Sequence, residues 1–217
     1  MPEPSPPCRW LRSVLAGLVF TGALTGLDDY AIARWMPWLR PSAPTLIHIR
    51  TVFLPETRST AGATLVALWT YPASPLISAL VVATCAYALD RRNARRRAVG
   101  VVALWITANV LELIGKAGLT RPALDVASFR HSFPSGHSLR ACIVAAAVAW
   151  TWRRAGIAAA AWAATVPIAL VALGDHTPTD VIGGVLLASC LIAATDAAVA
   201  AHPRGGAGST TASSARS

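Results

Sequence analysis

Six apolar runs, each about as long as a membrane helix, restrict the fold of this chain more than any other feature. They cover residues 11–27, 72–89, 98–115, 136–152, 155–173 and 179–200. A helix needs about 20 apolar residues, with a range near 17–25, to cross the hydrocarbon core of a bilayer. Only 13% of the residues are charged, whereas soluble domains carry about 25%. The sequence therefore predicts an all-α polytopic membrane protein with six transmembrane helices.

The chain outside these runs predicts one membrane domain, at 11–201, between two tails. Residues 1–10 are rich in proline, and residues 202–217 are rich in glycine, serine, threonine and alanine, so we expect both tails to be disordered. The first apolar run follows Arg9 and Arg12, as in a signal peptide. It lacks a clear small-x-small cleavage site, so we interpret it as a retained span.

Arginines between the apolar runs predict the orientation in the membrane. They occur in the N-terminal tail, between runs two and three, and between runs four and five: Arg9, Arg12, Arg91, Arg92, Arg95, Arg96, Arg97, Arg153 and Arg154. Six spans place these segments on one side, which the positive-inside rule makes the cytoplasm. Both termini are then cytoplasmic, and connections 116–135 and 174–178 are extracytoplasmic. We expect a multi-pass plasma-membrane protein, and the Ala- and Arg-rich composition suggests a bacterium with a high-GC genome.

Other functional classes find little support in the composition. The net charge of +9 is concentrated in these short clusters, without a basic stripe, interleaved aromatic residues or a nucleic-acid motif, so we expect no nucleic-acid partner. The cysteines have neither metal-ligand spacing nor a disulfide pattern, and we expect inert packing residues. They are Cys8, Cys85, Cys142 and Cys190. The sequence leaves the oligomeric state open.

Two clusters of polar residues fall on the extracytoplasmic face, in or beside the predicted spans. One contains Lys116, Arg121, Arg130, His131, Ser135, His137 and Arg140, and the other contains Asp175, His176 and Asp180. Charged residues inside membrane helices cost roughly 2.5–3.5 kcal/mol each on insertion scales, so they are usually paired or functional. Three of the five histidines lie in these clusters, which predicts a functional site.

Each cluster includes a helix start with a chemical interpretation. Ser135 is a good N-cap for the fourth span, and the free amides of a helix N-terminus bind anions. Gly136 lacks the side chain that would keep a phosphate from the backbone, and His137 follows in the first turn. A plain helix start and an isolated structural histidine are the alternatives.

At the sixth span, Thr177 is expected to be the N-cap and Pro178 the first helical residue. Asp180 can reach back past this cap toward His176. An Asp–His contact would fix the imidazole tautomer, as a nucleophilic or basic histidine requires.

Taken together, these motifs resemble those of the type 2 phosphatidic acid phosphatases, which share their site with vanadium-dependent haloperoxidases. The family pattern is Lys, six residues and Arg-Pro; then Pro-Ser-Gly-His; then Ser-Arg, five residues, His, three residues and Asp. This chain has Pro134-Ser135-Gly136-His137 intact, with His176 and Asp180 at the family spacing. The resemblance covers roughly residues 60–200. A haloperoxidase is not expected, because those relatives are soluble.

The resemblance implies that His176 attacks phosphorus and forms a phosphohistidine, that Asp180 orients it, and that His137 protonates the leaving alkoxide. No metal or other cofactor is implied, because cationic side chains and amides supply the electrostatic stabilisation.

By the same resemblance, Ser135 and the Gly136 amide would hold phosphate oxygens that Lys116 neutralises. Glu112 lies four residues before Lys116, so the two side chains share a helix face. We expect Glu112 to hold Lys116 toward the phosphate. The alternative is two unrelated interfacial charges.

Two arginines of the family pattern are missing. The first motif has Ala123 at the arginine position, and Arg121 precedes it as a shifted candidate. The last motif has Leu170 at its arginine position. Arg140 shares a helix face with His137 inside a span, where an unpaired arginine would be expensive. We expect Arg140 to take over the missing phosphate contact. The alternative is an arginine that snorkels to lipid headgroups.

These features predict an integral membrane phosphatase that acts on a lipid phosphate monoester or pyrophosphate. Reactive groups at headgroup depth favour a lipid over a soluble ester. Phosphatidic acid, phosphatidylglycerol phosphate and polyprenyl (pyro)phosphate are all candidates. The missing arginines support an alternative: a catalytically silent protein that binds lipid phosphate, or a membrane scaffold or transporter.

Overall fold

The computed structural model describes residues 6–23, 67–119, 133–172 and 176–201. Within these residues all regular structure is helical, which confirms the all-α class for this part of the chain. The helices are α1 (Pro6–Ala23), the 3-10 helix η2 (Tyr71–Ala73), α5 (Pro75–Arg91), α6 (Arg95–Gly118), α7 (Gly136–Thr151), α8 (Arg153–Ala172) and α9 (Pro178–Ala200).

Capping residues and prolines set where these helices begin. Pro75 and Pro178 occupy the first turns of α5 and α9, where a missing N–H costs nothing. Asn93 adopts a left-handed conformation with φ of 57° in the short turn between α5 and α6, a conformation that asparagine tolerates better than most residues. The helices consequently begin and end within a few residues of the predicted second to sixth spans.

The first helix differs from its predicted position. We expected a span over 11–27 after a disordered tail, but α1 extends from Pro6 to Ala23. Proline is well suited to the first position of a helix, so the proline-rich sequence here initiates the helix. Residues 202–217 lie outside the described part of the chain.

Several helices are able to cross a membrane. Among the described residues, α6, α8 over Arg153–Val171, and α9 are long and apolar enough. The bent pair Ala67–Ala73 and Pro75–Arg91, with an angle of 52°, is a fourth candidate. The 16 residues of α7 reach only about 24 Å at 1.5 Å per residue, which is short of a hydrocarbon core of about 30 Å. The six-span count and the cytoplasmic termini therefore stay predictions.

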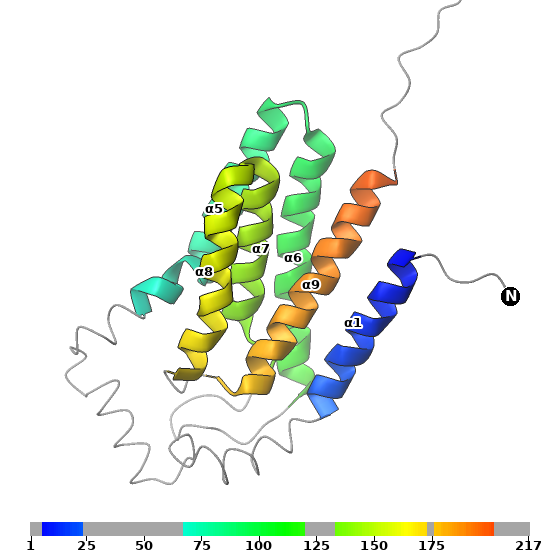
Figure 1. Ribbon diagram of the computed structural model, residues 1–217, viewed down its shortest axis with the longest axis vertical. Helices are drawn as coiled ribbons and strands as arrows, with labels where there is room; N and C mark the ends of the chain where they lie inside the picture. Colours follow the sequence, from blue (N-terminus) through cyan, green and yellow to red (C-terminus); the bar gives the residue numbers. More distant parts are fainter. Residues whose placement is uncertain (1–5, 24–66, 120–132, 173–175, 202–217) are drawn as a thin grey trace, which may run out of the picture.

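The helix ends gather at two opposite ends of the bundle (Figure 1). The C-terminus of α6 and the N-termini of α7 and α9 meet at one end, which we call the site end. The α5–α6 turn, the α7–α8 turn and the C-terminus of α9 lie at the other, which we call the arginine end (Figure 1). The arginine end holds Arg91, Arg92, Arg95, Arg96, Arg97, Arg153 and Arg154.

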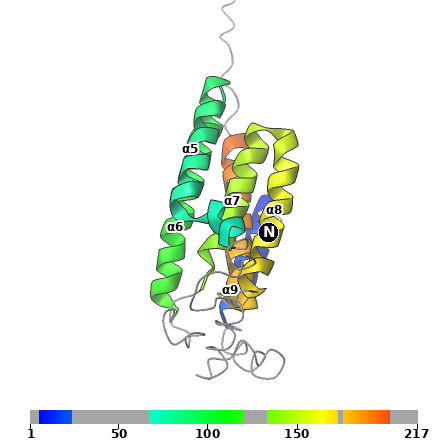
Figure 2. The same cartoon turned by 90° about the vertical axis from the view of Figure 1, so that its left-hand side faces the viewer.

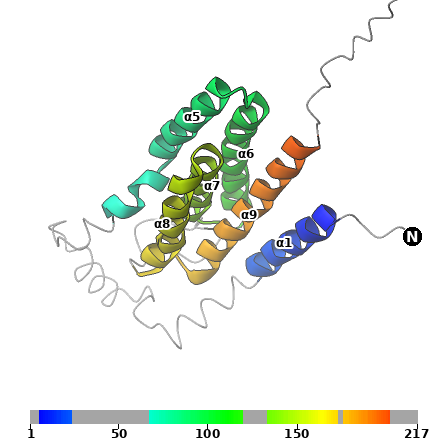
Figure 3. The same ribbon diagram turned by 45° about the horizontal axis from the view of Figure 1, so that its top comes forward.

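Two apolar clusters form the core. The larger one joins α5, α6, α7 and α9 and includes the fully buried Val101, Leu139 and Ile143. The smaller one joins η2, α7, α8 and the start of α9, and it includes Val166 and Leu170. The first helix, α1, lies along the outer side of α9 (Figure 3). The core thus holds the starts of α7 and α9 against each other.

Candidate active site

The start of α7 is capped by the predicted residue. The Ser135 Oγ accepts a hydrogen bond from the Ser138 amide at 3.4 Å and another from the Ser138 hydroxyl at 3.2 Å. Ser135 itself is fully buried. Its capping role is therefore confirmed, and a phosphate contact made by Ser135 stays a prediction.

The start of α9 forms a complete capping box. The Thr177 Oγ1 accepts from the Asp180 amide at 3.3 Å, and the Asp180 Oδ2 accepts from the Thr177 amide at 3.1 Å. The same Oδ2 lies 3.4 Å from the Nδ1 of His176. Asp180 is fully buried, and the His176 side chain is 13% exposed. The predicted Asp–His contact is confirmed. Because it is made by Nδ1, Nε2 is the ring nitrogen of His176 that does not take part in this contact.

A backbone hydrogen bond joins these two helix starts. The Ser135 amide donates to the Asp180 carbonyl at 2.9 Å. Gly184, one turn after Asp180, permits this approach, since a Cβ there would lie 2.5 Å from the Ser135 carbonyl oxygen and 3.2 Å from the Ser138 Cβ. The two predicted polar clusters therefore meet at the site end, and α9 must carry a glycine where α7 touches it.

Gly184→Ala is expected to destabilise the protein by about 1–3 kcal/mol, the usual cost of forcing an extra carbon into a packed interface. It should also lower activity, because α7 and α9 carry different histidines. Thermal unfolding in detergent and phosphate release are the measurements. Gly118→Ala is the matched control, since a Cβ there meets nothing within 4 Å. Equal effects of the two substitutions would contradict this account.

Glu112 is the centre of a buried charge network. Its Oε1 accepts from the Nζ of Lys116 at 2.6 Å, which confirms the predicted pair. Its Oε2 accepts from the Nη1 of Arg140. Glu112 is only 5% exposed, so its charge depends on these two cations. A Cβ at Gly136 would overlap the Glu112 carboxylate. Gly136 therefore makes room for Glu112, a requirement that the sequence did not reveal.

Arg140 lies inside the bundle and is 4% exposed. Besides Glu112, its Nε donates to the Ala73 carbonyl at 2.8 Å, and its Nη1 donates to the Asn109 Oδ1 at 3.1 Å. The guanidinium thus joins α7 to α6 and to η2, which lies beside α7 (Figure 2). Arg140 does not extend to lipid headgroups, the alternative that we considered for it.

The charge network and the histidines belong to one site. His137 directly follows Gly136, which lies against the Glu112 carboxylate. The Ser135 amide donates to Asp180, the residue that contacts His176. Asn109 was not among the residues predicted for the site, although it precedes Glu112 by three residues and Lys116 by seven. That spacing places all three on one helix face.

The remaining sequence candidates are residues that the structure does not describe and one position on α8. Arg121 lies outside the described residues, as do Arg130, His131 and Asp175. Leu170, at the position of the missing family arginine, is 3% exposed and packs in the apolar cluster that contains Ala73. Arg140 binds the carbonyl of that same Ala73. Leu170 and Arg140 therefore approach one small region from α8 and α7.

Glu112→Gln is expected to raise KM for a phosphate substrate about tenfold, equivalent to about 1.4 kcal/mol, because Lys116 loses the carboxylate that directs it. The unfolding temperature should also fall, since Arg140 keeps a buried charge without its anionic partner. Steady-state kinetics and thermal unfolding measure the two effects separately. An unchanged KM in a folded variant would remove Glu112 from substrate binding.

Fold and site together define a class. The features are those of a membrane enzyme for an anionic substrate. They are the membrane-length helices, the two histidines at helix starts, the buried aspartate and the cluster of paired cations.

The family model of the PAP2 superfamily matches residues 10–203, so the chain belongs to this superfamily, as the resemblance in its motifs indicated. Membership implies phosphatase or phosphoesterase activity on phosphate esters. Neither the comparison with curated proteins nor the comparison with solved structures finds a match.

Proposed function

We propose that this protein hydrolyses a phosphate monoester or pyrophosphate carried by a membrane lipid, through a phosphohistidine formed on His176. The observation that carries this proposal is the hydrogen bond between the Ser135 amide and the Asp180 carbonyl. It holds the His137 helix start and the His176 helix start together, so one phosphate can lie between two histidines with different roles.

In the first step, the Nε2 of His176 attacks phosphorus while the bond to the leaving oxygen breaks. Asp180 accepts a hydrogen bond from the Nδ1–H of His176. This bond leaves the Nε2 lone pair free for attack and stabilises the charge that develops on the ring. His137 donates a proton to the leaving oxygen. The products are the phosphohistidine and the lipid alcohol, or a lipid monophosphate where the substrate is a pyrophosphate.

In the second step, water attacks the phosphohistidine. The neutral His137 takes a proton from the water as the bond between phosphorus and the His176 Nε2 breaks. Inorganic phosphate leaves, and both histidines return to their starting states. Every proton is accounted for within the side chains described, and the mechanism assigns no role to a metal ion.

The phosphate oxygens carry negative charge throughout, so positioned cations and amides supply much of the stabilisation. Lys116 and the Gly136 amide are the candidates at the α7 start, together with Ser135. Arg140 is the proposed replacement for the family arginine at position 170. Arg121 is a further candidate from the adjoining connection.

A lipid is the favoured substrate because the site lies at one end of membrane-length helices, at headgroup depth. Phosphatidic acid, phosphatidylglycerol phosphate and polyprenyl (pyro)phosphate all present the required group. A substrate panel with the detergent-purified chain tests the proposal: phosphate release is expected without added divalent metal and in the presence of a chelator. Inactivation by the chelator with recovery on adding magnesium would overturn the mechanism.

A second candidate is a catalytically silent protein that binds lipid phosphate, or a membrane scaffold or transporter. Leu170, buried among apolar side chains at the arginine position of the family pattern, favours it. The same panel separates the two functions, because a silent protein releases no phosphate from any lipid.

We also propose a plasma-membrane location with the site end facing the extracytoplasmic side. Cysteine placed at Arg95, in a background without the native cysteines, should be labelled only from the cytoplasm. Cysteine placed at Asp125 should be labelled only from outside, since arginine-rich connections stay cytoplasmic. A membrane-impermeant maleimide on intact cells and on inverted vesicles gives the measurement, and the reverse labelling would invert the proposed topology.

A further inference from the structure

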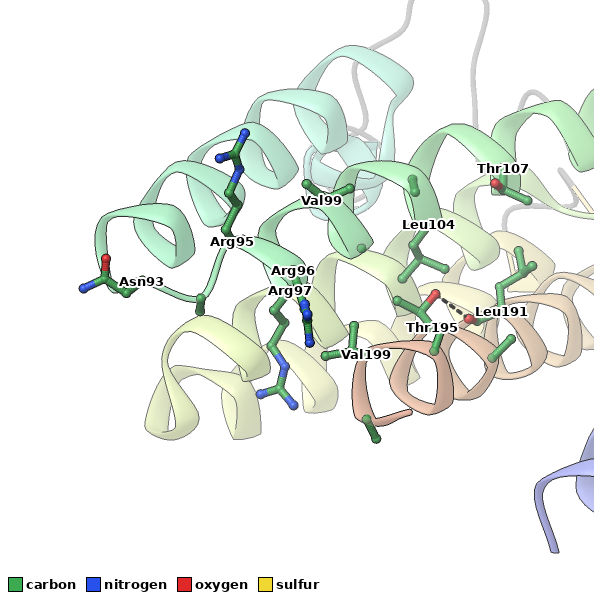
Figure 4. Close-up of a pocket in the computed structure, with 16 residues that line it drawn as sticks. Asn93, Arg95, Arg96, Arg97, Val99, Leu104, Thr107, Leu191, Thr195 and Val199 are labelled. Atoms are coloured by element: carbon green, nitrogen blue, oxygen red, sulfur yellow. Dashed lines mark hydrogen bonds between the residues drawn. The ribbon is translucent and has the colours of Figure 1, made fainter. Parts of the chain in front are cut away.

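A groove of about 1260 Å³ lies between α6 and α9 toward the arginine end, away from the candidate active site (Figure 4). Val99, Ala103 and Thr107 contribute to its α6 wall, and Leu191 and Val199 contribute to its α9 wall. The described side chains along both walls are thus mostly small or apolar. The groove can therefore accept a hydrocarbon chain without burying unpaired polar groups.

Arginines occupy one end of this groove. Arg96 and Arg97 line the groove on the side of α6 that faces α7 and α9, whereas Arg95 points away from them (Figure 4). The Arg97 guanidinium lies 6.0 Å from the centre of the Trp150 ring, which helps to hold it near the groove. The groove therefore combines apolar walls with a cationic mouth.

The length of the groove matches one leaflet of a bilayer. From Arg96 to Thr107, α6 rises roughly 16 Å at 1.5 Å per residue. Half of a hydrocarbon core of about 30 Å is about 15 Å. Because α6 and α9 are both long and apolar enough to cross a membrane, we expect the arginines at the headgroup level of one leaflet and Thr107 near the bilayer centre.

We propose that this groove binds an anionic phospholipid from the leaflet at the arginine end, with an acyl chain between α6 and α9 and its phosphodiester at Arg96 and Arg97. Basic clusters beside membrane helices attract anionic headgroups. The arginine fork pairs well with phosphate oxygens. The bound lipid is distinct from the substrate, because the candidate active site lies at the opposite end of the bundle.

Charge disfavours two other occupants. A second copy docked symmetrically on this groove would place its arginines against these arginines. Residues 202–217, which follow α9 in the sequence, contain Arg204 and Arg216 and no acidic side chain. An anionic lipid supplies both the hydrocarbon and the negative charge that the groove matches.

The experiment is a binding competition on the full chain, purified in a neutral detergent. Equal amounts of dioleoyl phosphatidylglycerol and dioleoyl phosphatidylcholine are added, and retained lipid is counted by native mass spectrometry. Neither lipid carries a phosphate monoester, so the result does not depend on turnover. We expect phosphatidylglycerol to be retained at least about tenfold over phosphatidylcholine, the discrimination expected for about 1.4 kcal/mol of headgroup binding.

Two kinds of variant distinguish the contribution of the arginine charges to lipid binding from that of the apolar groove. Arg96→Gln/Arg97→Gln should abolish the preference for phosphatidylglycerol. Ala103→Trp places a large side chain at an exposed groove position and should reduce retention of both lipids.

Matched controls remove or add the same groups elsewhere. Arg153→Gln/Arg154→Gln removes two arginines at the same end but outside the groove, and Ala160→Trp adds a tryptophan on the exposed side of α8. Both should bind phosphatidylglycerol as the wild type does. Equal retention of the two lipids by the wild type would overturn the proposal, as would an equal loss in the control variants. A dimer that Ala103→Trp dissociates would show instead that a second copy occupies the groove.

Discussion

Replacing His176 by alanine is expected to lower phosphate release from a lipid phosphate by more than about 10⁴-fold, because losing the nucleophile leaves only binding and electrostatic contributions. The His176 ring is positioned for attack, since Asp180 holds its Nδ1 at 3.4 Å while the side chain stays partly exposed. Phosphate release in detergent micelles is the measurement, and an unchanged unfolding temperature shows that the variant is folded.

His137→Ala is the comparison variant for this experiment. A proton donor contributes about 10²–10⁴-fold, so the loss should be smaller than at His176. It should shrink further with a leaving group that is already a weak base, such as a nitrophenolate. A folded His176→Ala variant that keeps a tenth of the wild-type activity would exclude the phosphohistidine mechanism.

Arg140→Ala is expected to lower kcat by about 10²–10³-fold, the usual effect of removing one positioned donor from an anionic transition state. Arg140→Lys keeps the charge but loses the planar fork, so it should retain only part of the activity. Kinetics alone would not separate catalysis from folding, because Arg140→Ala leaves Glu112 buried without its strongest partner. Breaking a buried pair in this way costs about 3–5 kcal/mol.

A second substitution therefore separates the two effects. Adding Glu112→Gln to Arg140→Ala removes the buried carboxylate that has lost Arg140 and keeps only Lys116 as its cation. It should recover unfolding temperature without recovering turnover. Adding Leu170→Arg to Arg140→Ala should recover some turnover, since Leu170 packs in the same apolar cluster as Ala73, whose carbonyl binds Arg140. Leu170→Gln is the uncharged control. Wild-type kinetics in Arg140→Ala would leave Arg121 and Arg130 as the remaining phosphate-binding candidates.

Contacts between residues close in the chain were predictable from the sequence. The Glu112–Lys116 pair, the Thr177–Asp180 capping box and the His176–Asp180 contact each join residues three or four positions apart. Helix geometry places such residues on one face or around one cap. The helical class and the approximate helix bounds were predictable for the same reason, because apolar runs and prolines determine the local backbone structure.

Contacts across helices were not predictable in this way. Arg140 meets Glu112 over 28 positions and Ala73 over 67, so its partners depend on how η2, α6 and α7 pack. The sequence indicated that Arg140 lies inside a span, where an unpaired charge costs free energy. It did not identify the anion that pairs with Arg140.

The helical class, the two histidine-bearing helix starts and the contact between Asp180 and His176 could be predicted from the sequence, because each depends on residues within a few positions. The packed bundle was needed to show that Glu112 lies against Gly136 and that Gly184 admits the start of α7. Small residues let membrane helices approach closely, and which glycine faces which helix depends on the whole packed bundle.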